Sequence, residues 1–278
     1  EVTGKGCIKF DRNLTSIGYY AFAFRPNLIS VTIPNSVTNI GESAFKECHE
    51  LTSITIPDNV TSIGARAFNR CYKLTSINLP SKLTYIGLEA FCYCSGLASI
   101  TLPDGVNYIE QYAFQYCSEL TSIVLPAGLT GMGARPFEQC TNLKYALFLG
   151  TTPPSYPEPE PEYPTYPFTD CGTNVGGTKL LVPDNAVDSY KAAGYTNVLL
   201  SSTYFSEIKI NALNEIETAM KGVTLTQDDA DFVATCKTNI ENTFDLDTIL
   251  QERGKALFVI SLQKAKEDAI AGINAALN

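Results

Sequence analysis

The residues of this chain that could do chemistry are nine cysteines, one histidine and a few neighbouring glutamates. Thiolates and imidazole are common zinc ligands and nucleophiles, and two carboxylates held at a fixed separation can act as acid and base. Five cysteines recur every 23 residues, each three residues after a phenylalanine: Cys48, Cys71, Cys94, Cys117 and Cys140. This spacing puts one cysteine in each repeat of a stack, so it predicts a buried column of reduced thiols that serve packing.

The other candidates for chemistry are isolated. Cys92-Tyr-Cys94 is a short thiol pair, but the only histidine is His49 and no second pair has zinc spacing. Glu158 and Glu160 lie in a proline-rich stretch, which does not hold an acid and a base in fixed geometry. The sequence also lacks a phosphate loop and a nucleophile motif. We therefore expect no catalytic residue, no cofactor and no metal site.

The interval of 23 residues also governs the apolar positions. The five coils that begin at Leu28, Leu51, Leu74, Leu97 and Leu120 follow LxxLxLPxxLxxIGxxAFxxC, with Val, Ile and Leu exchanging, and Leu143 continues the interval. A period of this length predicts a solenoid. We expect each coil to contain a short strand that ends at a proline, an inward Ile, a bend at a glycine and one helical turn at Ala-Phe. Because Glu110 replaces the glycine in one coil, a positive φ is not expected to be obligatory there.

Composition and charge restrict the possible partners. The 278 residues are 45% apolar and 18% charged, which is typical of an ordered protein with a sizeable core. The net charge is −9 and no cluster of Lys and Arg occurs, so nucleic acid is not an expected partner. No apolar run approaches the roughly 18 residues that span a bilayer, and the first residues do not form a signal peptide. A processed secretory protein would look the same.

The repeat covers about residues 5–200 and continues into Pro153-Pro154 and Leu181-Val-Pro183-Asp-Asn-Ala-Val187. This pattern resembles the BspA-like leucine-rich repeats of bacterial cell-surface proteins. The resemblance implies a leucine-rich repeat solenoid of short parallel strands plus short helical turns, of the β/α type. It also implies a secreted or surface-anchored protein of host-associated bacteria, some of which adhere to host matrix proteins or to other cells. The repeat identifies a scaffold and provides no catalytic residues to carry over.

The chain is predicted to have two regions. Residues 1–200 form the solenoid, with an N-terminal cap (5–27), full coils from 28, a proline-rich insertion (151–167) and a C-terminal cap (178–198). The insertion should be a stiff, extended loop that is either read by a polyproline-binding partner or lies on the protein's own surface. Residues 201–278 show helical spacing and a capping box at Thr226 and Asp229, which predicts a small all-α bundle or modular appendage.

Tyrosines provide the candidate partner-binding residues. Tyr85 and Tyr108 share one column, Tyr93 and Tyr116 share another, and Tyr112 lies on the turn after the bend. Exposed tyrosines suit a protein or glycan surface, and the alternative is that these rings cover the back of the solenoid or dock the C-terminal region.

A second candidate surface is a ladder of small hydroxyl residues on the first strands, such as Ser53 and Thr55. We interpret this ladder as a solvated strand face with cross-strand hydrogen bonds. The sequence thus predicts a non-enzymatic secreted or surface protein for adhesion or protein binding, with glycan binding as the alternative. Host-derived ligands are included among the expected partners, and the oligomeric state is left open.

Overall fold

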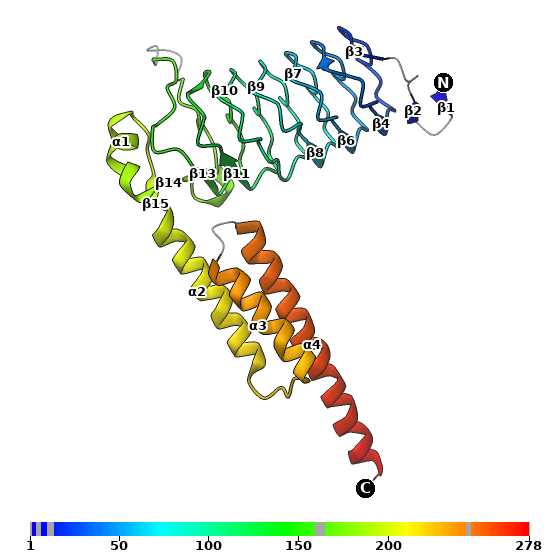
Figure 1. Ribbon diagram of the computed structural model, residues 1–278, viewed down its shortest axis with the longest axis vertical. Helices are drawn as coiled ribbons and strands as arrows, with labels where there is room; N and C mark the ends of the chain where they lie inside the picture. The colour runs from blue at the N-terminus through cyan, green and yellow to red at the C-terminus, as the bar shows by residue number, and fades with distance from the viewer. Residues whose placement is uncertain (1, 4–6, 10–13, 159–164, 243–245, 278) are drawn as a thin grey trace. The chain divides into compact units, whose positions relative to one another are not determined.

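A computed structural model describes residues 2–3, 7–9, 14–158, 165–242 and 246–277. The chain divides into two compact units, Glu1–Leu200 and Ser201–Asn278. In Figure 1 the first unit is a stack of coils, and the second is a group of three helices. Each unit has its own core and is described separately below.

The first strands of the early coils form a parallel sheet along one side of the stack. Its strands are β2 (Cys7–Lys9), β4 (Ser30–Thr32), β6 (Ser53–Thr55) and β8 (Ser76–Asn78), and β1 (Val2–Thr3) closes the edge by pairing antiparallel with β2. The register follows the repeat, since Val31 pairs with Ile54 and Ile54 with Ile77. The predicted strand before the proline is confirmed at Pro34, Pro57, Pro80 and Pro126, whereas residues 99–101 before Pro103 form no strand. Because β2 pairs with β4, the segment predicted as an N-terminal cap already supplies a strand to this sheet.

A second parallel sheet runs along another side of the stack (Figure 1) and was not predicted. It is built from two-residue strands: β3 (Ser16–Ile17), β5 (Asn39–Ile40), β7 (Ser62–Ile63), β9 (Tyr85–Ile86), β10 (Tyr108–Ile109) and β12 (Gly131–Met132). The second residue of each strand is the predicted inward residue and is buried. The first residue of each strand is therefore available to the outer side of the sheet, which is where Tyr85 and Tyr108 lie.

The predicted helical turn at Ala-Phe is wrong. In residues 41–48 and their equivalents, called here the turn segments, Ser43, Phe45 and Glu47 donate their N–H groups to carbonyl oxygens of the next coil, each at 2.8 Å. A helix would direct these donors to residues four positions earlier in the same segment. Two residues per turn segment have positive φ instead, among them Ser43 (55°) and Glu47 (58°). This alternation points the N–H groups of every second residue along the stack.

Phenylalanine and cysteine columns fill the centre of the stack. The rings of Phe45, Phe68, Phe91, Phe114 and Phe137 stack in sequence, with centroids 5.3–5.5 Å apart. Each cysteine thiol donates to the carbonyl oxygen of the phenylalanine one coil earlier, as Cys94 Sγ does to Phe68 O at 3.1 Å. Eight cysteines, which include the whole column from Cys48 to Cys171, are free and buried. The predicted buried column is therefore confirmed, and the thiol fits it because it is both small and a donor.

The glycine at the bend is needed for space. Gly64 and Gly133 do not have positive φ, as expected from Glu110. A Cβ atom on Gly133 would lie 2.3 Å from the backbone N of Gln111, whereas one on Gly18 in the first coil would meet nothing within 4 Å. Glycine therefore allows successive coils to approach closely at the bend.

The stack ends in a sheet of longer strands. This third sheet contains β11 (Ser122–Leu125), β13 (Tyr145–Phe148), β14 (Lys179–Val182) and β15 (Val198–Leu200), all parallel, with α1 (Val187–Ala192) between the last two. Short 3-10 turns occupy Thr173–Val175 and Asp184–Ala186. As predicted, the repeat resumes at Phe168 and Cys171, because Phe168 stacks on Phe137 with centroids 5.2 Å apart.

The proline-rich insertion is anchored at both of its ends. Tyr156 and Tyr166 pack edge to face, and both rings contact Tyr195. Tyr166 Oη accepts hydrogen bonds from the backbone and side chain of Thr196. At residues 151–158 and 165–167 these contacts are consistent with the alternative in which the insertion lies on the protein's own surface, while residues 159–164 lie outside the described chain.

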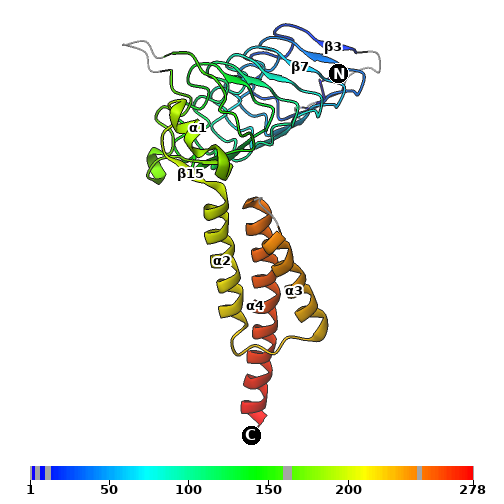
Figure 2. The same ribbon diagram turned by 60° about the vertical axis from the view of Figure 1, so that its left-hand side comes forward.

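The second unit consists of α2 (Ser201–Met220), α3 (Gln227–Asn242) and α4 (Leu246–Leu277). Figures 1 and 2 show α4 beside both other helices and continuing past them. Its core is lined by a few residues on each helix: Ala212, Ile216, Val233, Cys236, Ile240, Ile249, Ala256 and Ile260. Thr226 Oγ1 accepts a hydrogen bond from the N–H of Asp229 at 3.2 Å, which confirms the predicted cap of α3. The predicted all-α character of this region is confirmed, with three helices in the described residues.

Candidate functional site

The thiols do not form a reactive site. Burial raises the pKa of the Cys48 thiol to about 11 and that of Cys92 to about 12, and it also raises the pKa of the other column cysteines. A nucleophilic cysteine needs the opposite shift. His49 stacks beside Tyr72 with centroids 5.0 Å apart. Over the described ranges, no three His, Cys, Asp or Glu residues come together as metal ligands do.

The turn segments carry a surface whose side chains contact one another across neighbouring coils. Its side chains occupy three columns and are called here the turn ridge: Arg66, Asn69, Arg70, Glu89, Cys92, Tyr93, Tyr112, Gln115, Tyr116, Arg135, Glu138 and Gln139. Eight of the twelve project from residues with positive φ, where large side chains are uncommon. The backbone ladder holds these residues at the coil spacing, so neighbouring side chains meet across coils.

Tyr93 is the central residue of the turn ridge. Its ring lies 4.4 Å from the ring of Tyr116, with 12° between the planes, and the Arg70 guanidinium lies 5.4 Å from its centroid. Arg70 and Tyr116 are 23 residues before and after Tyr93, so the three side chains form a continuous stack. Burial, followed by the neighbouring Tyr116, raises the pKa of Tyr93, which keeps its hydroxyl protonated and able to donate. The two ring faces of Tyr93 are therefore occupied, and its ring edge is left for a partner.

Two polar clusters occupy the other two columns of the ridge. In the first, Arg66 donates from Nε and Nη2 to both carboxylate oxygens of Glu89, at 3.0 and 2.8 Å, and Asn69 Nδ2 donates to the same carboxylate at 3.2 Å. Bidentate pairs of this kind have one preferred geometry. Within the described residues, Arg70 forms no ion pair, so its charge remains available to a partner.

The second cluster lies at the end of the ridge nearest the proline-rich insertion in sequence. Arg135 Nη1 donates to Glu138 at 2.9 Å, and Gln115 donates its amide to the other oxygen of Glu138. The thiol of Cys92 donates to Gln115 Oε1 at 3.3 Å. Cys92 is thus a buried link of this cluster, which explains why it stands apart from the central column.

The other predicted tyrosine pair lies on the second sheet. Tyr85 of β9 and Tyr108 of β10 stack with centroids 6.1 Å apart, and Tyr85 Oη donates to Glu110 at 2.6 Å. Burial, followed by the bond to Glu110, raises the pKa of Tyr85. A Cβ on Gly131 would lie 2.7 Å from Tyr108 Cε2, so the ring of Tyr108 covers the next coil. The structure therefore brings the predicted pairs together, and their binding role stays a prediction.

Tyr112 belongs to neither stack. It has a φ of 56° and lies in the column between Glu89 and Arg135, partly exposed. Sequence reasoning identified the tyrosines and missed Arg70, Arg66 and Glu89. A signal for Arg70 was available, because it occupies the same repeat position as Tyr93 and Tyr116. The ion pair of Arg66 and Glu89 had the same signal, since these residues are also 23 apart.

The hydroxyl ladder on the first sheet is exposed and makes few contacts. Ser53, Thr55, Ser76 and Asn78 are all exposed on either side of the buried Ile54 and Ile77. Beside them Thr75 Oγ1 donates to the carbonyl oxygen of Thr52 at 3.2 Å, a hydrogen bond across neighbouring coils. These hydroxyls are consistent with the interpretation of a solvated strand face. No helix in the described part of the chain has the length and apolar character that crossing a membrane requires.

Comparison with known proteins agrees with the repeat architecture. A leucine-rich repeat protein of T. pallidum matches with 29% identity and a TM-score of 0.50, over 66% of this chain and 78% of that one. A leucine-rich cell surface protein of Faecalibacterium prausnitzii matches with 32% identity and a TM-score of 0.41, over 51% of this chain and 45% of that one. A leucine-rich repeat protein of Bacteroides ovatus matches with 29% identity and a TM-score of 0.46, over 62% and 48%.

The chain thus spans less than half the length of the last two proteins. No curated protein matches the chain. Six copies of the BspA type leucine rich repeat region match residues 8–146, which is half of the chain. Strands, bends and central columns recur throughout that range at the interval of the repeat. The chain therefore belongs to the BspA-type leucine-rich repeat family, a family of protein-interaction scaffolds that includes bacterial cell-surface proteins.

Proposed function

We propose that this chain is a non-enzymatic secreted or cell-surface protein that mediates adhesion by binding a partner protein through the turn ridge. The observation that carries the proposal is the stack of Arg70, Tyr93 and Tyr116, which is rigid and partly exposed. Arg and Tyr are the residue types that most often dominate binding energy at protein interfaces. Because the backbone and the neighbouring rings already fix these side chains, a partner would lose little conformational entropy on binding them.

The same geometry favours a protein over a glycan as the ligand. Sugar rings bind aromatic side chains by lying on the ring face, and both faces of Tyr93 are occupied by Arg70 and Tyr116. The exposed parts of this stack are ring edges, hydroxyl donors and a guanidinium. These groups suit hydrogen-bond acceptors and carboxylates on a protein surface. The surface location is supported by the cell surface protein of F. prausnitzii, which shares the repeat.

The test compares a ridge variant with a matched ladder variant on a panel of purified host matrix proteins. The ridge variant is Arg70→Asn, Tyr93→Asn and Tyr116→Asn, because Asn tolerates positive φ and leaves the backbone unstrained. The ladder variant is Thr32→Ala and Thr55→Ala on the exposed strands β4 and β6. Surface plasmon resonance should show a matrix protein that binds wild type and the ladder variant, with binding reduced at least about tenfold by the ridge changes.

Two results would oppose the proposal. Undiminished binding of a matrix protein by the ridge variant, with its circular dichroism spectrum unchanged, would place the binding surface elsewhere. Loss of wild-type binding on addition of free sugars, together with binding on a glycan array, would favour the glycan alternative.

A further inference from the structure

The first sheet is interrupted in the middle of the solenoid. Its strand order ends at β8, and residues 99–101 of the next coil form no strand although they carry the Ser-Ile-Thr sequence of β6. On their other side these residues keep a bridge between Thr101 and Val124. The second sheet and the turn segments stay continuous here, since Tyr85 pairs with Tyr108 and Phe91 N donates to Ala113 O at 2.8 Å. The coils thus separate on one side only, at a place called here the seam.

A periodic hydrogen bond identifies the seam independently. At the start of each first strand, one backbone N–H donates to the carbonyl of the residue 23 positions earlier, as Thr75 does to Thr52 and Thr121 to Ala98. The equivalent bond from Ala98 to Thr75 is absent among the described residues, and no backbone bond joins residues 75–79 to 97–102. Both sides of the seam therefore present unpaired backbone donors and acceptors, which is the property of sheet edges that accept another strand.

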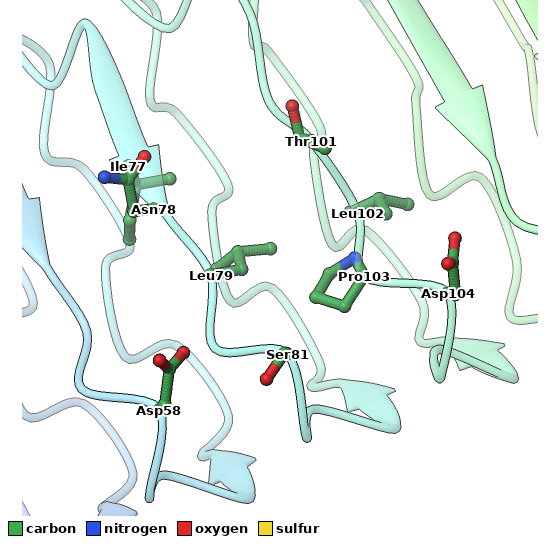
Figure 3. Close-up of a pocket in the computed structure, with 9 residues that line it drawn as sticks. All are labelled: Asp58, Ile77, Asn78, Leu79, Ser81, Thr101, Leu102, Pro103 and Asp104. Atoms are coloured by element: carbon green, nitrogen blue, oxygen red, sulfur yellow. The ribbon is translucent and has the colours of Figure 1, made fainter.

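A groove of about 520 Å³ opens where the seam meets the end of the strands. Figure 3 shows the segment from Ile77 to Leu79 on one side and the segment from Thr101 to Pro103 on the other. Leu79 is only partly buried, whereas the equivalent residues Ile56 and Leu102 are buried. The groove therefore has an apolar contact available beside its backbone edges.

The groove is acidic at one end. Asp58, Ser81 and Asp104 occupy the same position in three consecutive coils, and Figure 3 shows Ser81 between the two carboxylates. Neither Asp58 nor Asp104 forms an ion pair with a described residue. Two carboxylates beside an apolar wall suit a long basic side chain, whose methylene stem covers apolar surface while its charge reaches the acids.

We propose that the seam binds a short extended segment of a partner protein, with a lysine side chain of that segment lying between Asp58 and Asp104. The segment pairs its backbone with the exposed edges of residues 76–78 and 99–101, as in β-strand addition. Leu79 contacts the stem of the lysine. The seam and the turn ridge share no residue, so binding at one surface does not require the other.

The first part of the test measures whether the seam exists in solution. Hydrogen exchange of the full chain should be faster at the Ala98 amide than at the equivalent amides of Thr75 and Thr121, by at least about tenfold, because only Ala98 lacks an acceptor. Equal protection at the three amides would show a continuous sheet and would overturn the proposal.

The second part uses the blocked tripeptide acetyl-Leu-Lys-Leu-amide as the probe, titrated into the isotope-labelled full chain. Amide shifts are expected at residues 77–79 and at Thr101, Leu102 and Asp104, and they should weaken at least about fivefold for the norleucine peptide, which has no charge. The double variant Asp58→Asn and Asp104→Asn should lose the preference for lysine and keep its fold. Equal affinity for the two peptides, shifts confined to other residues, no shifts at all, or equal shifts from methylammonium alone would each overturn the proposal.

Discussion

The solenoid and the helical unit bury their cores in different ways. In the solenoid each buried side chain contacts its own equivalents in the coils before and after it, as Phe91 contacts Phe68 and Phe114. In the helical unit the core joins residues that are unrelated in sequence, such as Val233 and Ile260. A core substitution in the solenoid should therefore affect mainly the coils before and after it, whereas one in the helical unit should affect the single small core that its helices share.

The two units also differ in the polar groups they bury. The described part of the solenoid contains seven buried thiols, and the helical unit contains one, Cys236. Glu252 of α4 is nearly buried and accepts hydrogen bonds from Asn239 and Lys255, and the bond from Lys255 is the first cause that lowers the pKa of Glu252. The buried polar groups of the solenoid are thus mainly thiols that must stay neutral, with Glu138 as a paired carboxylate, whereas the helical unit buries one thiol and one carboxylate.

The largest expected effect comes from alkaline pH. An unfolded thiol loses its proton near pH 8.5–9, whereas burial raises the pKa of Cys48 to about 11 in the folded solenoid. Stability is therefore fully present below about pH 8.5 and is lost as pH rises towards 11. Each thiol with a raised pKa lowers the free energy of unfolding by about 1.4 kcal/mol per pH unit within that window. Because seven thiols act together, we expect urea denaturation to show the solenoid unfolding between about pH 9 and 11.

The helical unit should lose less stability over the same range, because Cys236 is the one thiol among its described side chains, with a pKa raised to about 11. Hydrogen exchange at pH steps, quenched and resolved by region, distinguishes the two units. The variant Cys71→Ala with Cys117→Ala should show a smaller pH dependence than wild type. An equal loss of protection in both units would contradict the role of the thiol column.

The next largest effect is expected from Phe91→Ala. Removing a buried phenylalanine costs about 3–5 kcal/mol, since it leaves a cavity between two rings. Pulsed alkylation with mass spectrometry should show faster labelling at Cys71, Cys94 and Cys117 and little change at Cys48 or Cys171. The matched change Ile240→Ala in α3, at about 2–5 kcal/mol, should speed labelling of Cys236. Uniform acceleration at all solenoid cysteines would mean that the stack opens as one body.

A smaller effect is expected from glycine substitution at the bend. Gly133→Ala should cost about 1–3 kcal/mol, because the new Cβ meets the backbone of the previous coil at 2.3 Å. Gly18→Ala serves as the control and should stay within about 0.5 kcal/mol, since the space around it is open. Thermal unfolding measures both. Similar costs at the two positions would show that the glycines are needed for conformation rather than for close approach.

The smallest effect concerns the turn ridge. Tyr116→Asn and Tyr116→Val both remove the ring that stacks on Tyr93, but Val is β-branched and disfavours the observed φ of 61°. We expect Val to be less stable than Asn by about 1–2 kcal/mol in urea denaturation. At Gly222 of the helical unit, which has a φ of 77°, the variant Gly222→Val should likewise be less stable than Gly222→Asn. Equal stability of the two Tyr116 variants would contradict the positive φ observed in the turn segments.

The sequence predicted those parts of the fold that depend on burial and spacing. The proline after each strand, the inward Ile and the columns of Phe and Cys all follow from residue type at a fixed interval, and they are confirmed. The second sheet was missed because its strands are two residues long and its outer positions vary from Ser62 to Tyr85 to Gly131. The turn segments were missed because their positive φ falls on Arg66, Glu89 and Tyr93, with no glycine to indicate it.

The candidate site was predicted less completely. Alignment of the coils placed Tyr93 beside Tyr116 and Tyr85 beside Tyr108, since the column position is enough for that. Which ring faces are occupied depends on the distance between coils and on Arg70, and these follow only from coordinates. The seam was not predictable, because Ser99-Ile-Thr101 is identical in sequence to Ser53-Ile-Thr55, which forms a strand. The visible differences are Asn78 and Ala98, two residue types that are depleted in strands.

The one-way direction of the N–H groups in the turn segments has an evolutionary consequence. Every coil offers donors to the coil after it and acceptors to the coil before it, in the same places. Tandem duplication of one coil would therefore create a junction identical to those already present, and deletion of one would restore the same junction. Chain length can drift by whole coils while the outward side chains change independently. A lineage with this architecture can change its surface under selection while the junctions that maintain the fold stay the same.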